Sequence, residues 1–317
     1  MGSIMEYITL KNSDLRVSRL CMGGCPMGGY GWGVVQEQEL IDAVHAAIDN
    51  GVNIFDTADT YGLGQSERTL GKALGKRRKD VVIADKFGVR AGNGATFYDN
   101  SPRYIREALD LSLKNLGTDY IDIYQVHYRD EKTPLAAVIE TLEQLRNEGK
   151  IRYYGLSNIH EADFEEVKPF IGRIVSVQDE YSLACRKNEK TLRTLSCDYR
   201  ITPFTWGSLG QGILTGKYDK SVSFASDDRR SRDIYVNFHG EKLIKNLEIV
   251  EAMKPVAVAH GKPVSSVAIR FILDWLDDSV VLVGAKRSNQ ILDNIEALDW
   301  KLSDNELQIL DKVSSGD

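Results

Sequence analysis

VNIFD at 52–56, VVIADK at 81–86 and IDIYQVH at 121–127 are the stretches that decide the fold of this chain. Each is a short apolar run, rich in Val and Ile, that ends in a polar or charged side chain. Such runs are typical of strands buried on both faces of a parallel sheet. Between them, 66–75 and 102–116 carry apolar residues at helical spacing. The alternation predicts repeated βα units.

The same alternation continues through the rest of the 317 residues. We expect further strands at 20–23, 151–157, 174–178, 200–206 and 280–283, and further helices at 37–50, 134–148, 188–196, 241–259 and 264–276. No linker divides the chain, so residues 1–317 are expected to form one domain, an α/β fold of the (β/α)₈ TIM-barrel type. A doubly wound sheet is the alternative, and the absence of a GxGxxG turn in a βαβ setting argues against it.

The two ends and two irregular segments complete the predicted barrel. YITLKNSDLRVSRL at 7–20 reads as an N-terminal β-hairpin around an Asn-Ser-Asp turn, which would close the bottom of the barrel. Ser303 and Glu306 form a capping-box pattern for a C-terminal helix. The segments 88–100 and 216–240 break the regular spacing, and we expect both to be loops above the site.

Composition limits the possible partners. The chain is 42% hydrophobic and 27% charged, with a net charge of −6 and scattered Lys and Arg, which argues against a nucleic-acid or anionic-membrane surface. The four Cys residues have no metal-ligand spacing, and no apolar run reaches the roughly 18 residues that span a bilayer. The start has no signal-like stretch, so we expect a cytoplasmic protein without a metal. The sequence carries no signal for an oligomeric state.

Polar side chains end the predicted strands. A (β/α)₈ barrel builds its site from the C-terminal strand ends and the loops that follow them. The strand ends here carry Asp56, Lys86, His127, Ser157, Asn158, Gln178 and Trp206, and the last strand runs into Gly284 and Lys286. Alone, Lys86 could extend to solvent and His127 could be a core histidine. Their shared position at one end of a barrel favours a functional site.

At these positions the chain resembles the aldo-keto reductase family, over nearly its whole length. NIFDTADTYGLGQSE at 53–67, VVIADKFG at 81–88 and IDIYQVH at 121–127 are similar to the family's catalytic segments. GKIRYYGLSN, SVQDEYS, LGQGILTGKY and GAKRSNQILDN are similar to its cofactor-binding segments, in the family's order. The resemblance implies a catalytic tetrad of Asp56, Tyr61, Lys86 and His127 in an oxidoreductase acting on a small aldehyde, ketone or sugar-like substrate.

The four residues suit the reduction of a carbonyl, which needs a hydride on carbon and a proton on oxygen. Tyr61 is the expected acid. An ammonium about 4 Å from its oxygen would favour phenolate by about 4 kcal/mol, and Lys86 is that ammonium. Asp56 would hold Lys86 charged and limit its effect on Tyr61. His127 could donate a hydrogen bond to the substrate or relay a proton.

A nicotinamide needs a stacking platform and amide partners at its edge. Trp206 fits the first requirement, and Ser157, Asn158 and Gln178 fit the second. Gly207, Leu209, Gln211 and Gly212 belong to a Gly-rich segment that would admit a pyrophosphate.

After the last strand, the expected cofactor residues are Gly284, Lys286, Arg287, Ser288, Gln290 and Asn294. The adjacent cations Lys286 and Arg287 suit a ribose 2′-phosphate, so we expect NADPH rather than NADH.

The substrate side is less specified. Trp32 and Tyr128 are expected to line the mouth, with Met27 near the first strand end, and such aromatic walls favour a ring or a sugar face. Asp85 stands where the family usually has Thr or Ser. Strand alternation points Asp85 toward the helix layer, where a carboxylate needs a wetted rim or a neighbouring cation.

Two other functions compete with an NADPH-dependent reductase. Some relatives in this barrel family bind the cofactor and serve as accessory subunits of other proteins, so turnover must be measured. Metal-assisted hydrolysis on the same barrel is the third reading. It lacks support because the chain has no helical HxxxH pair, and of its five histidines only His127 ends a strand.

Overall fold

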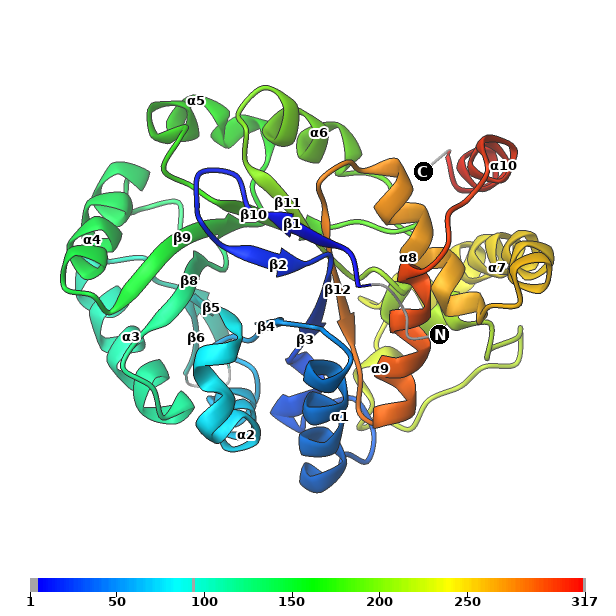
Figure 1. Ribbon diagram of the computed structural model, residues 1–317, viewed down its shortest axis with the longest axis horizontal. Coiled ribbons are helices and arrows are strands. Elements are labelled where there is room, and N and C mark those ends of the chain that lie inside the picture. The colour runs from blue at the N-terminus through cyan, green and yellow to red at the C-terminus, as the bar shows by residue number, and fades with distance from the viewer. Residues whose placement is uncertain (1–4, 93–94, 316–317) are drawn as a thin grey trace.

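Eight parallel strands close into a barrel in this computed structural model, which describes residues 5–92 and 95–315. The strands are β3 (Leu20–Gly23), β4 (Ile54–Asp56), β5 (Val82–Phe87), β8 (Ile121–Val126), β9 (Ile151–Ser157), β10 (Ser176–Glu180), β11 (Thr202–Trp206) and β12 (Val280–Gly284). Around the barrel they lie in chain order, and β12 pairs with β3 to complete the ring. The predicted (β/α)₈ barrel is confirmed, each expected strand included (Figure 1).

Helices surround the barrel in Figure 1 and return the chain from one strand to the next. They are α1 (Glu37–Asp49), α2 (Gln65–Leu74), α3 (Pro102–Leu116), α4 (Leu135–Asn147), α5 (Phe164–Val167), α6 (Glu189–Cys197), α7 (Gly240–His260), α8 (Val264–Trp275), α9 (Ser288–Ile295) and α10 (Asp304–Ser314). Helix α3 shows how local sequence sets the bounds. Ser101 accepts a hydrogen bond from the Tyr104 amide at its start, and Gly117 ends it in the left-handed conformation, with φ 65°.

Among the described residues, no single helix has the length and apolar character needed to cross a bilayer. Only α7 and α8 pass that test together, and they are bent by 94° where they meet.

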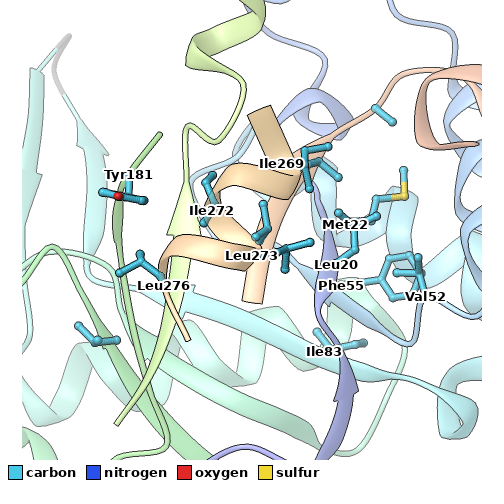
Figure 2. Packing of buried hydrophobic residues seen from close by; sticks show 14 of the residues in the cluster. Leu20, Met22, Val52, Phe55, Ile83, Tyr181, Ile269, Ile272, Leu273 and Leu276 are labelled. Atoms are coloured by element: carbon cyan, nitrogen blue, oxygen red, sulfur yellow. The ribbon is translucent and has the colours of Figure 1, made fainter. Parts of the chain in front are cut away.

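Strand alternation divides the buried side chains into two cores. On β3, Cys21 belongs to the core inside the barrel, whereas Leu20 and Met22 belong to the core between strands and helices. Figure 2 shows part of the outer core, to which Ile269 and Leu273 of α8 belong together with Leu20 and Met22 of β3. This packing holds the strands in place, so the barrel presents its polar strand ends on a rigid frame.

Both chain ends form the predicted elements. β1 (Tyr7–Thr9) and β2 (Arg16–Ser18) pair as an antiparallel hairpin, which lies across one end of the barrel in Figure 1. Leu10, Leu15 and Val17 of this segment are buried in the core inside the barrel, so the hairpin closes its bottom. At the other end, the capping box of α10 forms as expected between Ser303 and Glu306.

The expected loop at 88–100 is instead a second antiparallel hairpin, of β6 (Val89–Gly92) and β7 (Ala95–Tyr98). All four residues of β7 are exposed, so the strand has no buried alternation from which it could be predicted. Arg90 joins the two strands by contacts with the Phe97 ring and with Asp99. The 216–240 segment is the expected long loop, broken only by the 3₁₀ turns η6 (Arg229–Ser231) and η7 (Val236–Phe238).

Candidate active site

Lys86, at the end of β5, connects three of the four predicted catalytic residues. Its Nζ donates hydrogen bonds to Asp56 Oδ1 at 2.5 Å, to the Thr57 carbonyl at 3.2 Å and to Tyr61 Oη at 3.3 Å. The Lys86 and Asp56 side chains are both buried, at 1% and 3% exposure. The His127 ring lies edge-on to Tyr61, with 5.7 Å between centroids. The barrel therefore brings together residues from three different strand ends.

Asp56 is held from its other oxygen as well. Asp56 Oδ2 accepts from Gln178 Nε2 at 2.8 Å and from Gln125 Nε2 at 3.4 Å. Gln178, which we predicted to bind the nicotinamide amide, thus uses one of its two N–H donors for the carboxylate. Gln125 was not predicted, although it lies two residues before His127 and so faces the same side of β8. Strand alternation was therefore the feature of the sequence from which Gln125 could have been predicted.

Electrostatics keep the acid and the imidazole in defined states. Burial and the Asp56 charge raise the pKa of Tyr61 well above its usual value, so the phenol is protonated at neutral pH. The lowering of the Tyr61 pKa that we expected from Lys86 does not prevail over burial and the Asp56 charge. Burial and then Lys86 lower the pKa of His127 well below its usual value. The imidazole is therefore neutral, and its buried Nδ1 has no partner among the described residues.

These groups open into a cavity of about 990 Å³ at the C-terminal mouth of the barrel. Its wall includes most of the predicted site: Trp32, Asp56, Tyr61, His127, Tyr128, Ser157, Asn158, Gln178, Trp206, Gly207, Leu209, Gln211, Gly212, Gly284, Lys286, Gln290 and Asn294. Residues far apart in the sequence share this wall because each follows a different strand.

Four predicted site residues are not on the wall. Lys86 lies just behind it and reaches Tyr61, as described. Met27, in the 3₁₀ turn η1 (Cys25–Gly28), is 1% exposed and packs in the outer core. Arg287 and Ser288, after β12, are likewise absent from the lining.

The arrangement matches what whole-sequence comparison shows. The protein-family model of the Aldo/keto reductase family matches residues 19–315. The chain belongs to the aldo/keto reductase family. It is 33% identical over 314 residues to the aldo-keto reductase YhdN of Bacillus subtilis, across 98% of this chain and 93% of the relative. It is 30% identical over 328 residues to the NADH-specific methylglyoxal reductase of Escherichia coli, across 98% of each.

A solved structure agrees with the fold of this aldo/keto reductase. The glycerol dehydrogenase of Gluconobacter oxydans superposes with a TM-score of 0.87, at 30% identity over 97% of this chain and 94% of the other. The family resemblance inferred from the segments is thereby confirmed.

The predicted nicotinamide platform of this aldo/keto reductase is linked by hydrogen bonds. Trp206 Nε1 donates to Asn158 Oδ1 at 3.3 Å, and Asn158 Nδ2 donates to the His127 carbonyl at 2.9 Å. Ser157 Oγ donates to the Gln178 carbonyl at 2.9 Å. An indole on the cavity wall, hydrogen-bonded to an amide at its edge, fits a nicotinamide.

The Gly-rich turn fits the diphosphate end of the same cofactor. In η5 (Gly210–Thr215), Gln211 and Gly212 have φ of 55° and 108°. At Gly212 an added Cβ would meet no atom closer than 3.8 Å, so the backbone there is open to the cavity. Arg230 Nη1 is one of the atoms at that distance and brings positive charge.

The two cations after β12 face different surroundings. Lys286 Nζ donates to the Trp32 carbonyl at 2.7 Å, and burial and then Arg230 lower the pKa of Lys286. Arg287 Nε instead donates to Glu39 Oε1 on α1 at 3.1 Å, with its side chain 59% exposed. Lys286 is the member of the pair that faces the cavity.

Aromatic rings form the part of the wall that we predicted to face the substrate. His127 and Tyr128 stack with 5.1 Å between centroids, and Tyr128 stacks in turn on Tyr98 of β7 at 5.2 Å. The hairpin that replaced the expected loop therefore extends the aromatic wall outward. Arg229 and Cys25 also line the cavity and were not predicted as site residues.

Asp85 has neither the wetted rim nor the cation that we expected. It is fully buried; Oδ1 accepts from the Lys86 amide at 2.8 Å, and Oδ2 has no partner among the described residues. Burial, and then Glu67 and Asp59, raise the pKa of Asp85 well above its usual value. Burial also raises the pKa of Asp59, to about 7. We therefore expect Asp85 to hold a proton beside Lys86.

Replacing Asp85 by Asn is expected to stabilise the protein at pH 8. An acid with a raised folded-state pKa holds a proton that the unfolded chain releases above about pH 4, so stability falls as pH rises toward the folded-state pKa. Asp85→Asn removes this loss and keeps the acceptor for the Lys86 amide. We expect a melting temperature about 2 °C higher or more at pH 8, and a smaller gain at pH 5.

Asp122→Asn is the matched control for Asp85→Asn, because Asp122 is a buried carboxylate paired with Arg78 and Arg152 at 2.9 Å each. It should lower the melting temperature at both pH values. A lower melting temperature for Asp85→Asn at pH 8 would contradict the assignment of a protonated acid.

Proposed function

We propose that this chain is an NADPH-dependent reductase of small aldehydes, ketones or sugar-like carbonyl compounds, with Tyr61 as the general acid. The observation that carries the proposal is the hydrogen-bonded series Asp56–Lys86–Tyr61, which ends on a protonated phenol at the cavity wall. The family supports an oxidoreductase. The cofactor and the substrate do not follow from the family alone.

The chain's own residues would deliver and stabilise the proton. Bound NADPH supplies the hydride. Tyr61 holds the proton and gives it to the substrate oxygen, and the Lys86 ammonium, 3.3 Å away, stabilises the phenolate that remains. Asp56 keeps Lys86 charged and aimed. Neutral His127, whose ring centroid lies 5.7 Å from that of Tyr61, either donates to the substrate oxygen or relays a proton to Tyr61.

Binding of the cofactor is tested by titration with NADPH and, separately, NADH while tryptophan fluorescence is followed. A nicotinamide stacked on Trp206 should quench the emission, and Trp206→Phe should remove most of that quenching. Calorimetry checks binding without the fluorophore. If calorimetry detects no binding of NADPH or of NADH, the proposed cofactor site is wrong.

Preference for NADPH is expected to depend on Lys286. Lys286→Met should raise the Kd for NADPH about tenfold and the Kd for NADH at most about twofold, because only NADPH carries the 2′-phosphate. Arg287→Met is the matched control, since Arg287 pairs with Glu39 outside the cavity lining. It should have the smaller effect. An equal loss of both cofactors in Lys286→Met would argue against a 2′-phosphate contact.

A further inference from the structure

Arg229 presents a cation without a carboxylate partner to the cavity. Its Nη2 donates to the Tyr30 carbonyl at 3.1 Å and its Nη1 contacts Cys25 Sγ at 3.8 Å. The guanidinium carbon lies 5.6 Å and 5.2 Å from the ring centroids of Tyr30 and Trp32. Its Nε is buried with no acceptor, and no Asp or Glu of the described residues forms an ion pair with Arg229.

The neighbouring arginine faces a different part of the cavity. Arg230 is paired with Asp228 through two hydrogen bonds, of 2.9 Å and 2.6 Å, and its Nη1 lies toward Gly212 in the Gly-rich turn. Arg229 instead packs on the segment 25–32, where a Cβ at Gly31 would lie 2.8 Å from Arg229 Nε. Arg230 also contacts the Trp32 ring, at 5.9 Å from its centroid, but its Nη1 places it on the proposed diphosphate side.

The segment that holds Arg229 also packs against the proposed acid. A Cβ placed on Gly28 would lie 2.7 Å from the Tyr61 carbonyl carbon, so η1 runs directly beside Tyr61. The Arg229 charge is among the influences that lower the pKa of Tyr61, which burial raises overall. Arg229 and Tyr61 thus share one side of the cavity.

A half-buried guanidinium without a counter-ion is best satisfied by an anion from outside the chain. Its planar fork matches the two oxygens of a carboxylate, and the flanking rings of Tyr30 and Trp32 hold the plane so that little side-chain freedom is lost on binding. An uncharged substrate would leave the Arg229 charge at the cavity wall without a counter-ion.

We propose that Arg229 binds a carboxylate group on the substrate, so that short carbonyl compounds bearing a carboxylate are the preferred class. The inference rests on the proposed function and refines it: Tyr61 acts on the carbonyl oxygen while Arg229 holds the anionic end. Arg229 is a specificity-determining residue in this account.

The test compares three substrates built on the same short aldehyde. One carries a carboxylate, one carries the methyl ester of that carboxylate, and one carries a phosphate in its place. The variants are Arg229→Leu and, as a matched control, Arg232→Leu. Arg232 lies in the same loop and bonds Tyr30 Oη at 2.7 Å, but it is not on the cavity wall. Each protein is assayed for kcat/KM on all three compounds and for the Kd of NADPH.

The wild type and Arg232→Leu should prefer the carboxylate to the ester by about tenfold or more. Arg229→Leu should lose that preference, chiefly through KM, with its activity on the ester and its Kd for NADPH nearly unchanged. Arg229→Lys should restore part of the preference.

Besides a wild type that does not prefer the acid, three results would overturn the inference. They are equal loss on acid and ester, weaker NADPH binding in Arg229→Leu, which would place the arginine on the cofactor, and a preference for the phosphate. If uncharged carbonyls are reduced but acids are not favoured, only this inference fails. If nothing is reduced, the proposed function fails. Calorimetry of the NADPH complex with the matching carboxylic acid then still tests the role of Arg229. Binding of the acid that is lost in Arg229→Leu but kept in Arg232→Leu would support the carboxylate contact.

Discussion

Tyr61→Phe should lower turnover of carbonyl substrates by 100-fold or more, about 3 kcal/mol, while the Kd for NADPH stays nearly the same. The substitution removes one oxygen, which accepts from Lys86 Nζ at 3.3 Å and carries the proton that the product needs. Phe keeps the ring that lies edge-on to His127. Single-turnover kinetics with saturating cofactor would separate loss of the chemical step from loss of binding.

Tyr124→Phe is the matched control for removal of a phenol oxygen. Tyr124 is fully buried on β8, and its Oη has no partner among the described residues. Its variant should keep wild-type turnover. If Tyr61→Phe instead retained activity within about threefold of the wild type, Tyr61 would not be the acid and another cavity group would have to supply the proton.

Lys86→Met should abolish measurable turnover and also destabilise the fold by about 3 kcal/mol. The variant leaves the Asp56 carboxylate buried without its cation, and the amide bonds from Gln178 and Gln125 do not replace that charge. Urea unfolding followed by circular dichroism would measure the lost free energy of unfolding.

The double variant Asp56→Asn/Lys86→Met distinguishes stability from chemistry. Removing both charges should restore most of the free energy of unfolding, because no uncompensated charge stays buried, yet turnover should not return. Recovery of activity in the double variant would contradict the role of Lys86 in stabilising the Tyr61 phenolate.

The site residues at the strand ends could be predicted because the geometry of a barrel determines where its strands end. Once eight strands are recognised, the residues that end them must meet at one mouth, so Asp56, Lys86 and His127 converge whatever the intervening sequence. The same reasoning reached Trp206 and Asn158, at neighbouring strand ends.

Residues outside the strands could not be predicted in this way. Arg229 reaches the cavity from a long loop with no periodic pattern, and its position depends on packing against 25–32, about 200 positions earlier in the chain. Met27 was expected on the wall, but η1 turns its side chain into the outer core. Arg287 faces Glu39, a tertiary partner that sequence proximity to Lys286 does not reveal.

The most direct test of the account follows the hydride itself, with NADPH carrying deuterium at the transferred position of the nicotinamide ring. The purified protein is incubated with a panel of small aldehydes and ketones, and the products are examined by mass spectrometry. We expect alcohol with one deuterium on the former carbonyl carbon, formed by the wild type and at least 100-fold more slowly by Tyr61→Phe. Tight NADPH binding with no labelled alcohol from any carbonyl would contradict it and favour an accessory subunit that binds the cofactor without turnover.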